Sequence, residues 1–178
     1  KPESMENNLA VVGFYYLRDS QMLMSAIEQQ INNNTQTKGE YYLADAMQIL
    51  LDQGLQMQAN EVEVWKDCGK PESLLETNKH LLEHGHDNSA QLQVDGSVIV
   101  PPVNIHVDAK ITNSVIGPHA TIGADCTITS SIISDSIIEQ GTQIVDTVLT
   151  QSLIGSYTNV KGQSSTLNVG DQSEIGFE

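Results

Sequence analysis

Residues 111–138 read ITNSVIGPHATIGADCTITSSIISDSII, and this stretch decides the fold of half of the 178-residue chain. An aliphatic residue returns there after every five or six positions. A helix would repeat about every 3.6 residues and a half-buried strand about every two. A repeat of about six is typical of a parallel β-helix, in which each repeat forms one flat side of a coil. The full row comprises Ile99, Ile105, Ile111, Ile116, Ile122, Ile128, Ile133, Ile138, Ile144, Leu149, Ile154, Val160, Val169 and Ile175.

The residues between the members of the row support the same prediction. They are mostly Ser, Thr, Gly and Asn, which suit the narrow interior and tight corners of such a coil. Where the step shortens to five residues, a second aliphatic residue stands beside the first, as in Val115-Ile116 and Ile132-Ile133. We expect the extra residue to face outward. It then either contacts another domain or subunit or is an ordinary surface residue.

The charge of the chain limits its partners. The formal net charge is −15, with only eight Lys and Arg, so polymeric nucleic acid and acidic membranes are not expected partners. The two cysteines lie in segments of different character and suggest no disulfide framework, which favours a cytoplasmic location. Neither a transmembrane run of about 18 apolar residues nor a secretory signal is present. The first residue is not Met, so we expect a piece of a longer protein.

The first half of the chain has a different pattern and predicts a mixed α/β domain. Residues 9–17 form an apolar run typical of a buried strand. We expect helices after Asp19 or Ser20, over residues 40–53 with Gly54 at the end, and from Pro71 to near Gly85, with residues 55–65 extended. Residues 87–90 are a plausible hinge. The predicted domains are therefore residues 1–86 (α/β, Rossmann-like) and 87–178 (β-helix).

One carboxylate stands out as a candidate for chemistry. Asp67 lies between Lys66 and Lys70, after a predicted strand and before a helix, where open α/β sheets bind ligands. A single carboxylate there can hold Mg²⁺ together with phosphate oxygens. The alternative is structural, with Asp67 capping the helix or pairing with a neighbouring lysine.

Two further groups of residues allow both a functional and a structural interpretation. Lys38 precedes a predicted helix, where a cation and free N–H groups favour an anion, but a solvated loop lysine fits equally. His80 and His84 are four residues apart on a predicted helix, without a third metal ligand. We expect them to be exposed.

Several blocks together resemble the second half of the sugar-1-phosphate nucleotidylyltransferases. They are KP (1–2), NLAVVGFY (8–15), KGEYYLAD (38–45) and WKDCGKPESLL (65–75). The tail, with NSVIGP (113–118) and LNVGDQSE (167–174), is similar to the left-handed β-helix of long-form glucose-1-phosphate thymidylyltransferases. The resemblance implies a partial nucleotidyltransferase domain followed by a left-handed parallel β-helix, and it covers essentially the whole chain.

The resemblance also implies roles for individual residues. The family joins a nucleoside triphosphate to a sugar 1-phosphate with release of pyrophosphate, assisted by Mg²⁺. Asp67 would be a catalytic, metal-binding aspartate, and Trp65 would pack near it. The remaining substrate-binding residues would be Lys1 and Lys38 at the sugar phosphate, and Val11, Gly13 and Tyr15 in the sugar pocket.

The chain also departs from the family pattern. The Gly-rich nucleotide-binding loop and the first metal aspartate are absent, so we expect the 178-residue chain to be inactive alone. Lys38 stands where thymidylyltransferases usually have arginine, which would weaken bidentate phosphate recognition. The run from Glu40 to Leu43 also occurs in uridylyltransferases that act on N-acetylglucosamine 1-phosphate. Base and sugar therefore stay open.

A second class of function competes for the β-helix. Hexapeptide β-helices also occur in acyl- and acetyltransferases, where a histidine serves as base. His106 and His119 are the candidates here, although His119 is expected to be an exposed corner residue. The third possibility is a non-catalytic β-helix that docks subunits. We favour the nucleotidylyltransferase with a non-catalytic β-helix in a homo-oligomer.

Overall fold

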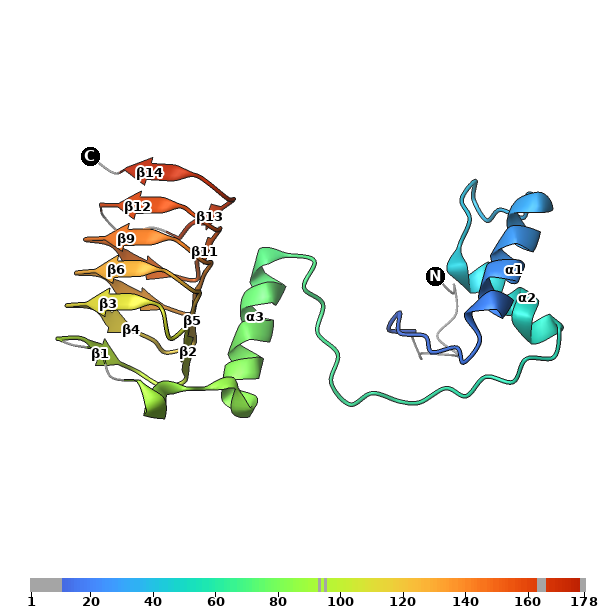
Figure 1. Ribbon diagram of the computed structural model, residues 1–178, viewed down its shortest axis with the longest axis horizontal. Helices are drawn as coiled ribbons and strands as arrows, with labels where there is room; N and C mark the ends of the chain where they lie inside the picture. The colour runs from blue at the N-terminus through green and yellow to red at the C-terminus, as the bar shows by residue number, and fades with distance from the viewer. Residues whose placement is uncertain (1–10, 93, 95, 163–165, 177–178) are drawn as a thin grey trace. The chain divides into compact units, whose positions relative to one another are not determined.

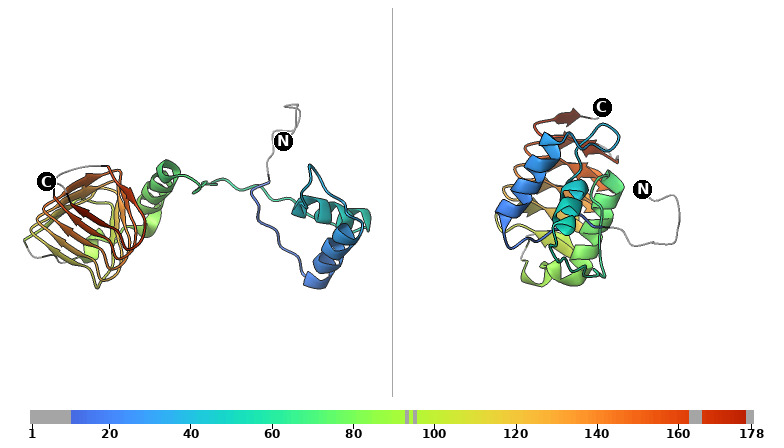
Figure 2. Two further views of the ribbon diagram at one scale, coloured as in Figure 1. Left: turned by 90° about the horizontal axis from the view of Figure 1, so that it is seen from above. Right: turned by 90° about the vertical axis from the view of Figure 1, so that its right-hand side faces the viewer.

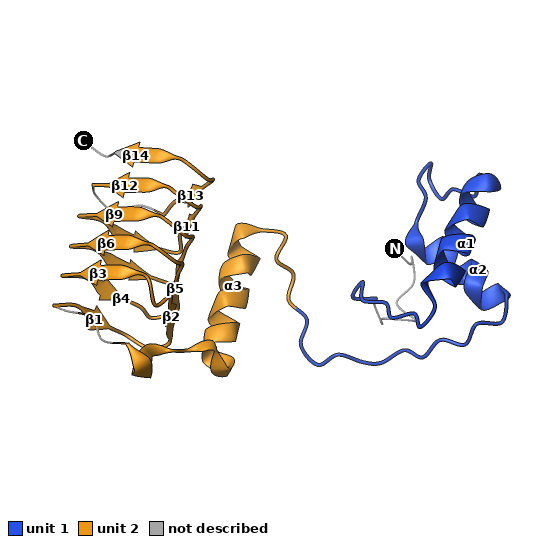
Figure 3. Ribbon diagram, viewed as in Figure 1, with its two compact units in different colours: residues 1–65 blue, residues 66–178 orange. Residues whose placement is uncertain are grey.

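The computed structural model describes residues 11–92, 94, 96–162 and 166–176, and it contains two compact units (Figures 1 and 3). Unit 1 comprises residues 1–65 and unit 2 comprises residues 66–178. The sequence places a domain boundary at residue 87. In the structure, residues 66–86 share the compact unit of the solenoid because the helix they contain packs against it.

Unit 2 contains a parallel β-solenoid, as the repeat predicts (Figure 2). Its short strands form three parallel sheets, one on each side of the coil. The first sheet is β1 (Val98–Ile99), β4 (Val115–Ile116), β7 (Ile132–Ser134) and β10 (Val148–Thr150). The second is β2 (Val103–Ile105), β5 (Ala120–Ile122), β8 (Ile137–Ile138), β11 (Leu153–Ile154) and β13 (Asn168–Val169). The third is β3 (Lys110–Thr112), β6 (Thr127–Thr129), β9 (Gln143–Val145), β12 (Asn159–Lys161) and β14 (Glu174–Gly176).

The aliphatic row forms the core of the solenoid. Every member from Ile105 to Val160 is at most 6% exposed, and members stack directly on one another in the parallel register. Ile122, for example, pairs with Ile105 below and Ile138 above, 17 and 16 residues away. Three full hexapeptides would need about 18 residues per coil. The five-residue steps therefore shorten the coils without displacing the buried residue.

Buried hydroxyl groups lie at the corners of the coil. Ser131 lies between Ser114 and Thr147 in neighbouring coils: its N–H donates to Oγ of Ser114 (3.0 Å), and its own Oγ accepts from the N–H of Thr147 (3.1 Å). The same hydroxyl donates to the carbonyl of Thr129 (2.8 Å). Ser136 and Ser152 repeat the arrangement at the next corner. These hydroxyls satisfy backbone groups where the strands end, which stabilises a buried turn.

The three outer faces of the solenoid differ in polarity. On the first sheet, Val98, Val115, Ile132 and Val148 stack as an outward column, and all except the half-buried Val115 are 44–57% exposed. This column confirms that the paired aliphatics place one residue outward. The third sheet presents polar residues, including Thr127. The second sheet lies beside α3 (Figure 1).

The chain between α3 and the first coil caps the solenoid. Helix α3 (Pro71–Leu81) begins with Pro71 in its first turn, as predicted, and continues into η1 (Leu82–His86), where Gly85 has a φ of 104°. After it, η2 spans Ser89–Gln91. Asp87 Oδ1 accepts the N–H of Val103 (3.0 Å), while the Asn88 side chain bonds both backbone groups of Ile105. These contacts occupy the open edge of β2, as a solenoid end requires.

Unit 1 is built from two helices, α1 (Ser20–Asn32) and α2 (Leu43–Asp52). Asp19 caps α1, and Gly54 follows α2 with a φ of 92°, both as predicted. The small core consists of Ala26, Ala46, Met47 and Leu50, with Leu17, Leu23, Ile27, Ile49 and Leu55 around it.

The predicted strand over residues 9–17 was wrong for the part that the structure describes. Residues 11–17 form no strand, and Phe14 and Tyr16 are more than 80% exposed. Residues 55–65 also form no strand. A buried strand needs neighbouring strands to pair with. The described part of unit 1 offers only the bridge between Thr37 and Glu40.

Candidate functional site

Asp67 lies in an exposed turn that leads into α3. Its Oδ1 accepts the N–H of Gly69 (3.0 Å), which folds the segment back before the helix starts. The side chain of Ser73, and not that of Asp67, contacts the N-terminal residue of the helix: the N–H of Lys70 donates to Oγ of Ser73 (3.3 Å). The structure thus supports neither an α3 cap nor, among the described residues, an ion pair of Asp67 with a lysine.

The predicted sugar-pocket residues lie on one segment of unit 1. Val11 and Tyr15 are 73% and 40% exposed, and Gly13 has a φ of 85° with open space around its Cα. A side chain would be strained at that φ, so Gly13 suits a sharp bend. Lys1 lies outside the described residues.

Lys38 occupies the tip of a tight turn and not a helix N-terminus. Lys38 and Gly39 both have positive φ (55° and 82°), and Thr37 and Glu40 exchange two backbone hydrogen bonds of 3.0 and 3.2 Å. This is the geometry of a two-residue hairpin turn. The hydroxyl of Thr37 donates to Asp45 Oδ2 (3.0 Å), which ties the turn to the first turn of α2. The Lys38 ammonium is therefore presented to solvent on an ordered support.

Trp65 is the last residue of unit 1 and is 60% exposed. Within the described part of unit 1, no hydrogen bond or ion pair joins two of the predicted site residues. Asp67 belongs to unit 2, whereas Val11, Gly13, Tyr15, Lys38 and Trp65 belong to unit 1.

Asp67 offers a cation one carboxylate oxygen, so most ligands of that cation would come from a bound phosphate compound and from water. Among the described residues, no three His, Cys, Asp or Glu side chains group as a metal site. The Asp67 carboxylate is exposed and uses Oδ1 for Gly69. One carboxylate oxygen is what Mg²⁺ takes when phosphate oxygens and waters fill the other positions. The residue therefore fits as a single ligand and not as part of a preformed cage.

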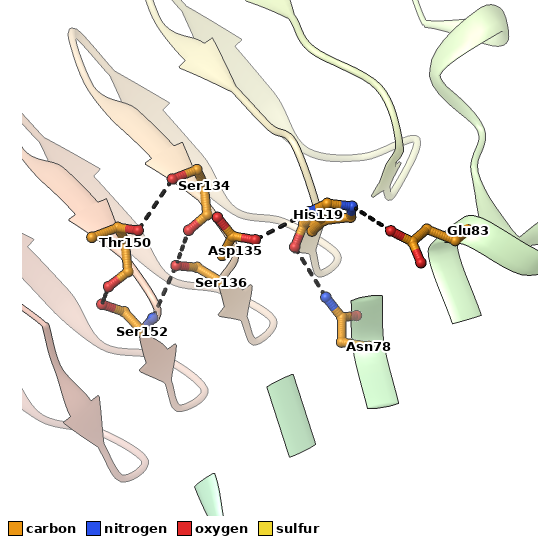
Figure 4. A network of polar contacts seen from close by, with 8 residues as sticks. All are labelled: Asn78, Glu83, His119, Ser134, Asp135, Ser136, Thr150 and Ser152. Atoms are coloured by element: carbon orange, nitrogen blue, oxygen red, sulfur yellow. Dashed lines mark hydrogen bonds and ion pairs between the residues drawn. The ribbon is translucent and has the colours of Figure 1, made fainter. Parts of the chain in front are cut away.

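A polar junction that the sequence reasoning missed joins α3 and η1 to the solenoid (Figure 4). His119 lies at its centre, with Nε2 3.1 Å from Glu83 Oε1 and Nδ1 3.1 Å from Asp135 Oδ1. Asn78 donates to the carbonyl of His119 (3.1 Å) and accepts from the hydroxyl of Thr121 (2.6 Å). The side chain of His119 is only 14% exposed, so the expectation of an exposed corner residue was wrong.

The position of His119 follows from the stacking of the coils. His119, Asp135 and Gln151 each have positive φ and precede a buried small residue in successive coils. They therefore stack in one corner column. The sequence carried a signal of this column, because His119, Asp135 and Gln151 follow one another at intervals of 16 residues, the length of one coil.

A groove of about 380 Å³ runs between this corner and α3. Its lining carries three carboxylates, those of Glu72, Glu76 and Asp135, together with Lys79 and His119. The remaining lining residues are Pro71, Leu75, Gln151, Thr166 and Asn168.

The two histidines proposed as bases of an acyltransferase are placed differently. Both ring nitrogens of His119 face carboxylate oxygens, Nδ1 that of Asp135 and Nε2 that of Glu83. His106 is 47% exposed at an outer corner, and its Nδ1 accepts the N–H of Asp108 (3.2 Å). His80 and His84 stack on each other with ring centroids 4.0 Å apart.

The environments of the two cysteines differ. Cys126 is buried, and its Sγ contacts the carbonyl of Glu139 (3.0 Å). Burial raises the pKa of the Cys126 thiol above its usual range because the thiolate would be poorly solvated. Cys68 is exposed, and neither Cys68 nor Cys126 forms a disulfide.

The stacked aliphatic residues form a solenoid of hexapeptide type, with a helix docked at one corner. Comparison with known proteins gives a match for two segments of the chain. Residues 1–84 match the family model described as Nucleotidyl transferase, and residues 88–144 match the model described as GlmU-like, C-terminal hexapeptide. The chain therefore combines a nucleotidyltransferase-like segment with a hexapeptide-repeat solenoid.

A curated relative supports the same relationship. The low-salt glycan biosynthesis nucleotidyltransferase Agl11 of Haloferax volcanii is 38% identical over 84 residues, which cover 47% of this chain and 22% of the relative. The chain thus spans about a fifth of the length of that protein. Residues 1–84 are thus similar to nucleotidyltransferases, and residues 88–144 are similar to a hexapeptide-repeat region.

No helix in the described ranges of the chain is long and apolar enough to cross a membrane.

Proposed function

We propose that the chain is part of a sugar-1-phosphate nucleotidylyltransferase that makes an NDP-sugar, of the dTDP-glucose type, and pyrophosphate. The observation that carries the proposal is the order of the two matched segments, a nucleotidyltransferase segment directly before a hexapeptide segment. The name of the Haloferax volcanii relative, a nucleotidyltransferase of glycan biosynthesis, agrees with a sugar phosphate as one substrate. The proposed substrates are a nucleoside triphosphate and a sugar 1-phosphate.

The reaction makes one phosphoanhydride bond and breaks another. An oxygen of the sugar phosphate attacks the α-phosphorus of the triphosphate, the bond to the β-phosphate oxygen breaks, and pyrophosphate leaves. Such a transfer needs in-line positioning and fixed cations more than a general base. Lys38, exposed on its hairpin turn, is suited to hold a phosphate, and we assign the same role to Lys1. The assigned sugar-pocket residues are Val11, Gly13 and Tyr15, with Trp65 packing beside the site.

We assign Asp67 as the catalytic, metal-binding residue of this part of the site. Bound Mg²⁺ would neutralise the charge that develops on the phosphate oxygens. The Asp67 carboxylate would hold the ion with one oxygen while Gly69 N–H fixes the other.

We further propose that the 178-residue chain is inactive alone, since it has neither the Gly-rich nucleotide loop nor a second metal aspartate. The test compares this chain with the full-length product of its gene. Both are assayed for pyrophosphate release with each combination of four nucleoside triphosphates and several sugar 1-phosphates. We expect turnover only from the longer protein, with one preferred pair. Turnover by the 178-residue chain would contradict inactivity, and failure of every pair with the longer protein would contradict the proposed reaction.

For the solenoid we propose a scaffolding role in a cytoplasmic homo-oligomer. Two chains with a charge of −15 each repel one another, so their contact requires an uncharged face. The column Val98, Val115, Ile132 and Val148 provides such a face. Sedimentation of Ile132→Glu should show a smaller assembly than that of the control Thr127→Glu on the polar sheet. Equal sedimentation of the two variants and the unmodified chain would exclude this face.

A further inference from the structure

Two histidines that have no part in the proposed reaction lie against each other at the C-terminal end of α3. The ring centroids of His80 and His84 are 4.0 Å apart, and the ring planes are inclined by 31°. His80 belongs to the last turn of α3, and His84 belongs to η1, directly before Gly85. Neither ring lines the groove between α3 and the solenoid. Imidazole nitrogens are common ligands of first-row transition metals, so a pair this close can be examined as a metal site.

One hydrogen bond fixes the tautomer of His84. Its Nδ1 lies 2.7 Å from the carbonyl oxygen of His80. A carbonyl oxygen only accepts hydrogen bonds, so Nδ1 must carry a proton, and Nε2 of the neutral ring then keeps its lone pair. Metal-bound histidines are commonly held in this way, with one ring nitrogen donating to a carbonyl group and the other bound to the ion. The His84 ring is therefore already arranged to bind a metal through Nε2.

His80 can supply the second nitrogen. Among the described residues, its ring has no hydrogen-bond or ion-pair partner. Two nitrogens that each bind one Zn²⁺ at about 2.1 Å lie no more than about 4.2 Å apart. Rings with centroids 4.0 Å apart can reach that spacing by rotation of the His80 side chain, which no hydrogen bond restrains.

The end of α3 favours a cation. The last carbonyl groups of a helix carry a partial negative charge, which stabilises positive charge beside them. Lys79, the other basic residue of the last turn, lines the groove with His119. No third His, Cys, Asp or Glu side chain groups with the pair within the described ranges. Water molecules would fill the remaining positions around a bound ion.

We propose that His80 and His84 form a two-histidine site for a divalent transition-metal ion such as Zn²⁺. The ion would bind Nε2 of His84 and one ring nitrogen of His80, and so connect the last turn of α3 to η1. The chain between these rings and the solenoid turns at Gly85, where φ is 104°. A bound ion therefore stabilises the last turn before this break. Mg²⁺ prefers oxygen ligands and should not compete for the site.

The test titrates the 178-residue chain, without any affinity tag, with Zn²⁺ and follows the ring ¹⁵N signals of its five histidines by NMR. We expect Nε2 of His84 and one nitrogen of His80 to shift together, with one ion bound per chain. Mg²⁺ at the same concentration should leave both signals unchanged. Loss of a group that only orients a metal ligand costs about 10–100-fold in affinity, so His80→Gln and His84→Gln should each weaken binding at least about tenfold. His106→Gln, at an exposed corner of the solenoid, is the matched control and should bind like the unmodified chain.

Amide hydrogen exchange of residues 81–86 gives a second measurement. Zn²⁺ should slow this exchange in the unmodified chain and in His106→Gln, and leave it unchanged in His84→Gln. The amide signals of β5 and β8 report whether each variant keeps the fold of the solenoid. Unchanged Zn²⁺ affinity in both His80→Gln and His84→Gln would overturn the proposal, as would equal shifts of His106 and of the pair in the unmodified chain. Neither measurement involves nucleotide or sugar, so the outcome is independent of the pyrophosphate assay.

Discussion

Replacing Ser131 by alanine removes one hydroxyl from the buried column at the first corner of the solenoid. Ser131 is 2% exposed, and its Oγ is the acceptor for the N–H of Thr147 (3.1 Å). The carbonyl of Thr129, which receives the hydroxyl proton, keeps a second donor, the N–H of Asp146 (3.1 Å). The main cost is therefore one orphaned backbone N–H in a buried corner. We expect the free energy of unfolding to fall by about 1–3 kcal/mol.

The measurement is urea unfolding followed through the NMR signals of β7 and β10, so that unit 1 does not contribute. Ser134→Ala is the matched control, because that half-buried hydroxyl donates only to Thr150 Oγ1, at 3.3 Å. It should change the free energy by less than about 0.5 kcal/mol. Ser131→Thr should keep most of the stability that Ser131→Ala loses. A threonine can make the same contact, as Thr147 does in the next coil, where its hydroxyl donates to the carbonyl of Val145 (2.8 Å).

A loss in Ser131→Ala no larger than in Ser134→Ala would refute the reasoning. It would mean that the buried N–H finds another partner and that the hydroxyl column contributes nothing to stability.

Three other predictions concern local features. The N–H groups of Val103 and Ser89 donate to the Asp87 carboxylate and lower its pKa in the folded protein. The Asp87 carboxylate therefore stabilises the fold fully above the pKa of an unfolded aspartate, about 4. This stabilisation is lost as pH falls through the lower pKa of Asp87 in the folded protein. Asp87→Asn should therefore flatten the acid end of the stability profile measured by circular dichroism, and an unchanged profile would contradict this. A maleimide should label Cys68 quickly and Cys126 only on unfolding, since burial raises the pKa of the Cys126 thiol; equal rates in mass spectrometry would disprove it. Gly117→Ala should cost more than about 3 kcal/mol, because its φ is 105° and a Cβ would overlap the carbonyl of Val100. Gly54→Ala, at 92° in open space in unit 1, should cost only about 1–2 kcal/mol when urea unfolding is followed through the NMR signals of α1 and α2.

The solenoid was predictable because its signal is local and repeated. Each inward residue from Ile105 to Val160 was placed correctly, and the Ile132-Ile133 pair indicated an outward neighbour. The buried hydroxyls were missed although their signal was present, since a Ser or Thr precedes each such pair. In a chain rich in Ser and Thr this pattern is hidden until the register of the coils is known.

The candidate site was less predictable for physical reasons. An apolar run such as residues 9–17 indicates a strand only if neighbouring strands complete a sheet. Lys38 was expected beside a helix, but the Lys38-Gly39 pair favours a two-residue turn that ends before α2 begins. The environment of His119 depends on contacts with Glu83, 36 residues away, and with the next coil. No local pattern reports such a contact.

The most direct test of the proposed function measures pyrophosphate release by the full-length protein and by Asp67→Asn at saturating Mg²⁺. Asp52→Asn, at the exposed end of α2, serves as the control. We predict a nucleotide- and sugar-phosphate-dependent rate that Asp52→Asn preserves and Asp67→Asn lowers about 10²–10³-fold, as expected for loss of a group that stabilises transition-state charge. An Asp67→Asn protein with the unmodified rate would contradict the assignment of Asp67.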